Sequence, residues 1–227
     1  MRDAAESRNR TLPAAGLAAL VIGSLLMGLL HVLPFATEVD PVRRTISEYA
    51  LGTGKWLFDV AVLLIAAGSA LAFAALVRNG RVRPLSATTV FAAGWILGLL
   101  TIVVFPKTDW SVGPSLGGTI HRYASVLAFV CLPLAVLAAA RATFPHSPAA
   151  RLLTRLLAIT SLGWFGVILG AVGLMLAGGE PWWRAIPLGL VERLLALNEV
   201  LAVGALALGL LRRRTAAPTG TAPLVRC

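Results

Sequence analysis

Charged residues are scarce in this sequence, at 13% of 227 residues, and the acids are scarcer than the bases, with 10 Asp and Glu against 20 Lys and Arg. Soluble domains usually contain about 25% charged residues, so this composition excludes an ordinary soluble protein. Hydrophobic residues make up 58% of the chain, and the mean hydropathy is +0.84. We therefore expect an integral membrane protein.

Cysteine is nearly absent, with two residues in the whole chain. Cys131 is predicted to lie in the middle of the membrane and Cys227 is the last residue, so the two cannot pair. This scarcity excludes both a disulfide framework and a cysteine-based metal site.

Apolar stretches are plentiful, and six of them reach the roughly 20 residues that a helix needs to cross a hydrocarbon core. The first stretch is too long for a signal peptide and lacks a convincing cleavage site, so we expect it to be retained. We predict an all-α bundle of six transmembrane helices over residues 13–211, with disordered polar tails at 1–12 and 212–227. The helices are predicted near 13–34, 56–77, 86–105, 120–140, 156–177 and 190–211.

The basic residues are distributed unevenly between the two sides of this predicted bundle. An even number of spans puts both termini on one side, and most of the arginines fall on that side. The positive-inside rule then predicts that both termini are cytoplasmic, in a multi-pass protein of a bacterial plasma membrane. The bases form no patterned face, which argues against nucleic acid as a partner.

The two tyrosines lie in nearly identical segments, 45–50 and 119–124, and each segment follows an apolar stretch that ends in a proline. A fainter third copy begins at Val191. The pattern favours three tandem helical hairpins in the same orientation. A chance match in a sequence of low complexity is the alternative.

Polar residues gather at the outer ends of the predicted helices, and all three hairpins contribute to the group. Glu199 lies seven residues beyond Glu192 on nearly the same helix face, about 10 Å deeper in the membrane. An acid at that depth is costly unless it is paired or faces a cavity. The group comprises His31, Asp40, Arg43, Arg44, Ser47, Glu48, Lys107, Asp109, His121, Arg122, Glu192, Arg193, Asn198 and Glu199.

One interpretation of this group is structural. Buried charges need partners to be tolerated, and ion pairs across the tops of the hairpins would provide them. The protein would then be a scaffold or a partner-binding membrane protein. The residues expected to pair are Glu48, Arg122, Glu192 and Arg193.

A second interpretation is a membrane-embedded hydrolase. His31, Asp109 and His121 are candidate ligands for a divalent metal such as zinc, whose bound water would attack an ester or amide bond. A metal-free version uses Ser47 as the nucleophile, a histidine as the base, and Asp40. Neither a His-Glu-x-x-His nor a Gly-x-Ser-x-Gly motif is present. The candidate catalytic residues are His31, Ser47, Asp109, His121 and Glu192.

A third interpretation, which we prefer, is binding of a lipid or another small amphiphile at the outer face. Basic side chains near the boundary are suited to phosphate, although boundary arginines also contact lipid phosphates without a specific role. The candidate ligand-binding residues are Asp40, Arg43, Arg44, Glu48, Lys107, Arg122, Arg193 and Glu199.

Glycines in the fifth apolar stretch recur at helical spacing and include a Gly-x-x-x-Gly pair. Small residues allow membrane helices to approach closely, so we expect this face to pack inside the protein, with a dimer contact through the same face as the alternative. The glycines are Gly163, Gly166, Gly170 and Gly173.

Several outer segments together resemble a known family. The segments are His31-x-x-Pro34, residues 40–49, Phe105-Pro106-Lys107-Thr108-Asp109, residues 120–123 and residues 189–193. In these the chain is similar to the bacterial and archaeal domain-of-unknown-function 998 family of six-helix membrane proteins, over most of residues 15–210. The resemblance implies six transmembrane helices and gives no reaction.

Overall fold

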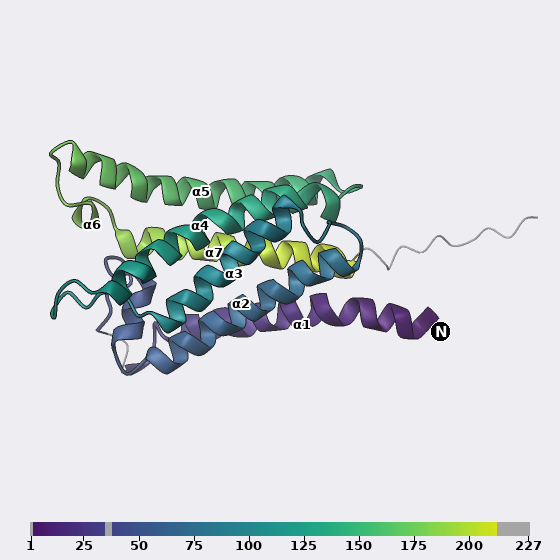
Figure 1. The fold of residues 1–227 in the computed structure, drawn as a ribbon, viewed down its shortest axis with the longest axis horizontal. Helices are drawn as coiled ribbons and strands as arrows, with labels where there is room; N and C mark the ends of the chain where they lie inside the picture. The colour runs from purple at the N-terminus through teal and green to yellow at the C-terminus, as the bar shows by residue number, and fades with distance from the viewer. Residues whose placement is uncertain (1, 35–37, 213–227) are drawn as a thin grey trace, which may run out of the picture.

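The computed structural model describes residues 2–34 and 38–212, with side chains from Arg10 onward, and this part of the chain is helical and contains no β-strand. Six long helices form a bundle, with two short helices at one end (Figure 1). All six are long and apolar enough to cross a membrane, which confirms the predicted six-helix membrane fold. The elements are α1 (Arg2–Leu29), η2 (Ile46–Leu51, a 3₁₀ helix), α2 (Lys55–Arg78), α3 (Ala87–Val104), α4 (Leu116–Thr143), α5 (Pro148–Leu176), α6 (Trp182–Ala185) and α7 (Leu188–Arg212).

Three of the predicted helix starts differ from the structure by more than two residues, and α4 begins at Leu116, four residues before its predicted start. The predicted end of the first helix is also too late, because α1 ends at Leu29 and not near residue 34. The expectation of a disordered N-terminal tail is wrong for residues 2–12, because α1 begins at Arg2. These residues include three arginines, two alanines and one glutamate, which favour helix, so the helix continues from the apolar span without a break. Helix α5 begins at Pro148, where a proline suits the first helical position, eight residues before the predicted start. The predicted disorder of residues 213–227 lies outside the described part of the chain.

The helices pair as successive hairpins. The most extensive contacts join α1 to α2, α3 to α4, and α5 to α7. The start of α1 and the end of α7 lie at the same end of the bundle, which we call the terminal end (Figure 1). At the opposite end lie η2, α6 and the connection between α3 and α4, and we call it the polar end (Figure 1).

Glycines allow the close approach of helices within the first two hairpins. A Cβ atom added at Gly68 of α2 would lie 2.7 Å from the carbonyl oxygen of Gly16 in α1. One added at Gly98 of α3 would lie 2.8 Å from the carbonyl oxygen of Ala124 in α4. The prediction for the fifth helix is wrong, because nothing lies within 4 Å of such an atom at Gly163, Gly166, Gly170 or Gly173. Helix α5 instead buries a different face, which includes Ala158 and Phe165.

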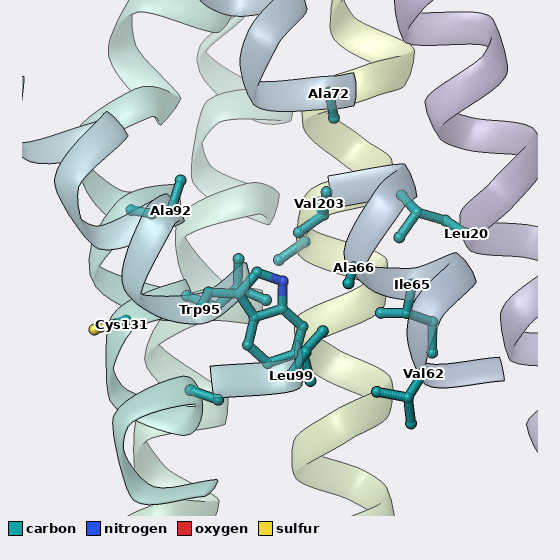
Figure 2. Close-up of a cluster of buried hydrophobic side chains, with 14 of the residues drawn as sticks. Leu20, Val62, Ile65, Ala66, Ala72, Ala92, Trp95, Leu99, Cys131 and Val203 are labelled. Atoms are coloured by element: carbon teal, nitrogen blue, oxygen red, sulfur yellow. The ribbon is translucent and has the colours of Figure 1, made fainter. Parts of the chain in front are cut away.

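Trp95 of α3 lies at the centre of the core, 3% exposed, among side chains from α1, α2, α4 and α7 (Figure 2). Its indole Nε1 donates a hydrogen bond to Ser69 Oγ of α2 at 3.0 Å. The only polar atom of the side chain is therefore satisfied, as buried donors generally are. This bond fixes the indole ring as one wall of the site described below.

Candidate functional site: an interhelical cavity below the polar end

A cavity of about 270 Å³ lies between α1, α2, α3, α4 and α7, with η2 at its outer side. Its walls are mostly apolar and include Phe58, Val62, Ile65, Trp95, Leu99 and Phe129. The polar side chains that line it come from η2, from the connection after α1, and from three of the long helices. They are Ser24, His31, Ser47, His121, Ser125, Glu192, Arg193 and Glu199.

Arg193 of α7 organises the outer part of the cavity, which we call the mouth. Its Nε donates to His31 Nε2 at 2.7 Å, and its Nη1 donates to the carbonyl oxygens of Arg44 at 2.7 Å and Gly189 at 2.9 Å. The guanidinium carbon lies 5.9 Å from the centre of the Tyr49 ring, within range of a cation–π interaction. One arginine thus joins the start of α7 to the connection after α1 and to η2.

The contacts of His31 define its protonation state. Its Nδ1 lies 2.9 Å from the carbonyl oxygen of Met27, which can only accept, so Nδ1 carries the proton. Nε2 is then the acceptor for Arg193, and the imidazole is neutral. Burial, together with the charge of Arg193, lowers the pKa of His31 below its ordinary value. Both ring nitrogens are therefore engaged by the protein.

This neutral histidine makes stability dependent on pH. The unfolded chain takes up a proton near the ordinary pKa of 6.5, whereas the folded protein resists protonation, so stability should fall as the pH drops below about 6.5 and should not depend on His31 above it. The variant His31→Gln keeps a donor and an acceptor but cannot titrate. Thermal unfolding measured in detergent at pH 7.5 and at pH 5.5 (about one unit either side of that value) should show a smaller acid-induced loss for the variant. Equal losses for the two proteins would contradict the assigned neutral state.

Segment 45–48, at the start of η2, is the point where the three hairpins meet. Glu192 of α7 accepts a hydrogen bond from the backbone nitrogen of Ile46 at 2.8 Å. Lys107, which follows α3, forms an ion pair with Glu48 and donates to Thr45 Oγ1 at 3.0 Å. The predicted convergence of all three hairpins on one polar group is therefore present at this end of the bundle.

The ion pairs differ from those expected in the structural interpretation. Glu48 pairs with Lys107 and, at 3.8 Å, with the exposed Arg44. Arg122 is exposed and has no ion pair within the described residues, because its position on α4 turns it away from the other hairpins. Arg193 bonds to a neutral histidine and to carbonyl groups instead of an acid.

Two polar side chains lie along the cavity without their full set of partners. His121 of α4 is 5% exposed, and its Nδ1 donates to the carbonyl oxygen of Phe105 at 2.8 Å, which leaves Nε2 as an acceptor. Glu199 of α7 is 1% exposed, and neither of its carboxyl oxygens has a hydrogen-bond partner among the described residues. The structure thus places Glu199 deep in the cavity wall, as its spacing from Glu192 indicates.

The three candidate metal ligands are not brought together. Asp109 lies in an exposed turn, where its Oδ1 accepts bonds from the Oγ of Ser111 at 2.6 Å and from its backbone nitrogen at 2.9 Å. These bonds lower the pKa of Asp109. Within residues 10–34 and 38–212, no group of three or more His, Cys, Asp or Glu side chains is arranged to hold a metal ion.

The components of the metal-free triad are also separate. The hydroxyl of Ser47 lies 3.2 Å from that of Thr45, and no histidine is hydrogen-bonded to it within the described residues. Asp40 accepts hydrogen bonds from the backbone nitrogens of Val42 and Arg43 in its own exposed turn. Arg43 is exposed and, like Asp40 and Arg122, does not line the cavity.

Residues that sequence reasoning missed form much of the cavity. Phe58, Trp95 and Phe129 could not be recognised from the sequence as cavity-lining residues, because core and cavity positions of an apolar helix have the same composition. Ser24 and Ser125 carry a weak signal, since a hydroxyl in the hydrocarbon region usually faces the interior of a bundle.

The comparisons with known proteins agree with this fold and give no activity. Residues 14–209 match the family described as "protein of unknown function (DUF998)". No curated protein and no solved structure matches the chain. The match extends over all six membrane-spanning helices and over the residues that line the cavity. The chain belongs to the DUF998 family of proteins of unknown function.

Proposed function

We propose that this protein binds a lipid or another small amphiphile in the cavity between its helices. The volume of about 270 Å³ is close to the lower limit of about 300 Å³ for small-molecule pockets, and it exceeds the roughly 150 Å³ of an apolar cavity that holds benzene. A single alkyl chain of moderate length suits this space, whereas a complete two-chain lipid does not. The proposal puts the polar end of the bundle at the outer face of the membrane, as the distribution of arginines predicts.

The single observation that carries the proposal is an apolar cavity whose polar groups are left without partners. Arg193 Nη2 is buried at the mouth without an acceptor, and both oxygens of Glu199 are buried deeper without a donor. A buried polar group without a partner costs about 1–3 kcal/mol, more when it is charged. A bound amphiphile would place its polar group on one of these two sites and its alkyl chain along the apolar walls between them.

The hydrolase alternative has less support in the geometry. His31 has no free ring nitrogen, Asp109 is outside the cavity, and Ser47 has no histidine partner among the described residues. Ser47 and Arg193 instead lie together at the mouth, where they offer hydrogen-bond donors to an oxygen-containing group.

Filling the cavity should prevent binding. Ala196 lines the cavity, so Ala196→Phe should lower the affinity for labelled octanol by at least about tenfold, which corresponds to 1.4 kcal/mol. The measurement is scintillation proximity with protein immobilised in a maltoside detergent. The matched control is Ala93→Phe on the exposed face of α3, which should leave binding unchanged. Absence of saturable octanol binding by the wild type, or equal binding by a folded Ala196→Phe variant, would rule the proposal out.

A further inference from the structure

With Glu199 ionised, the deep part of the cavity offers hydrogen-bond acceptors and no available donor among the described residues. The hydroxyls of Ser24 and Ser125 already donate to carbonyl oxygens of their own helices, at 2.7 Å and 2.9 Å, so only their lone pairs remain. His121 uses its proton on Phe105 and presents Nε2 as an acceptor. The two oxygens of Glu199 complete the set. A molecule that satisfies these atoms must bring donors of its own.

The charges along the cavity also favour a ligand that carries hydrogen-bond donors. Arg193 lines the mouth, and its Nε and Nη1 are already bonded to His31 and to backbone carbonyls. Glu199 lies six residues farther along α7, about 9 Å deeper. Among the described residues, no lysine or arginine other than Arg193 lines the cavity, so the Glu199 carboxylate has no cation of the protein beside it.

The aromatic walls suit a cation as well. Phe58, Trp95 and Phe129 line the same cavity as Glu199. Aromatic rings attract cations through the negative charge of their faces, an effect that increases when water is excluded. The indole proton of Trp95 is used by Ser69, so this ring offers the cavity no donor.

We infer that the ligand is an amphiphilic amine, with its ammonium group on the Glu199 carboxylate and its alkyl chain along the aromatic walls towards the mouth. This inference rests on the proposed function and names the class of its ligand. An ammonium group supplies three N–H donors and one positive charge, which match the acceptors and the unpaired acid. Hydrogen bonds between charged partners are roughly twice as strong as those between neutral ones, so such a ligand should be preferred over an alcohol of equal length.

The test compares octylammonium with octanol, which differ only in the group that reaches Glu199. Alkyl amines have a pKa near that of lysine, about 10.4, so octylammonium is charged at neutral pH. We expect the wild type to bind octylammonium at least about tenfold more tightly than octanol in the scintillation assay. Glu199→Gln should abolish this preference, so that its affinities for the two probes lie within about twofold of each other. The control Glu180→Gln, which removes an exposed acid outside the cavity, should keep the preference.

The outcomes separate the inference from the proposed function. Equal affinities for the two probes in the wild type, or an unchanged preference in Glu199→Gln, would overturn the inference and leave amphiphile binding intact. Failure of both probes to bind would remove the proposed function as well.

A second measurement on the wild type avoids dependence on the fold of the variant. A hydrophobic carbodiimide adds to buried carboxyl groups, and the adduct is located by peptide mass spectrometry. Octylammonium should protect Glu199 from the adduct at concentrations where octanol does not. Equal protection by both probes, or none by octylammonium, would again overturn the inference.

Discussion

Gly189→Ala should destabilise the protein by about 4 kcal/mol, although it adds a single methyl group. A Cβ atom at this position would overlap the carbonyl oxygen of Arg44 and lie 2.7 Å from that of Pro41. Both neighbours are backbone atoms, so segment 41–44 must move away from the start of α7. Overpacking costs about 1–3 kcal/mol, and the movement also breaks the hydrogen bond from Leu190 to Val42 and that from Arg193 to Arg44, each worth about 1 kcal/mol or more.

The matched control is Gly166→Ala in α5, where a Cβ atom meets nothing within 4 Å. There the better helix propensity of alanine should leave stability unchanged or raise it by up to about 1 kcal/mol. Thermal unfolding in a maltoside detergent should show a midpoint lower by roughly 10 °C for Gly189→Ala and no decrease for Gly166→Ala. Equal midpoints would mean that segment 41–44 does not pack on α7 as described.

Arg193→Met should cost about 3 kcal/mol of stability and should also disrupt the mouth of the cavity. Methionine keeps the apolar stem but removes three hydrogen bonds, to His31, Arg44 and Gly189. Hydrogen bonds to charged groups are worth about 1.5–3 kcal/mol each, and the released carbonyl groups near the boundary regain part of this from water.

Exposed Arg184 in α6 provides the control at the same end of the bundle, since surface substitutions usually change stability by less than about 0.5 kcal/mol. Arg193→Met should lower both the unfolding midpoint and the affinity for octanol, whereas Arg184→Met should change neither. A fully stable Arg193→Met variant would contradict the role of this arginine as the link between α7 and the η2 segment.

The helices could be predicted from the sequence because hydrocarbon imposes a length and an apolar composition on any span. The convergence of polar residues was also predictable, since an up-and-down topology brings the tops of all hairpins to one end. The helix boundaries were less predictable. Pro148 begins α5 well before the apolar stretch, because a membrane helix continues beyond the hydrocarbon as long as its residues favour helix.

The partners of the polar residues could not be predicted, because they depend on helix rotation and on the path of the connections. Opposite charge suggested an acid as the partner of Arg193, yet the connection after α1 brings His31 and the Arg44 carbonyl within reach first. The packing of the α5 glycines could not be predicted for the same reason. Their spacing defined a shared face, but whether another helix covers that face depends on how α5 is rotated in the bundle.

The fluorescence of Trp95 tests most directly whether the cavity holds an amphiphile. The indole is 3% exposed and lines the cavity, so a quencher in the surrounding detergent does not reach it. The protein for this measurement keeps Trp95 as its sole tryptophan, with phenylalanine at positions 56, 110, 164, 182 and 183. Bromooctanol should quench its fluorescence in a saturable way that unbrominated octanol reverses and Ala196→Phe abolishes. Quenching that is absent, or that rises linearly without competition, would contradict binding in the cavity.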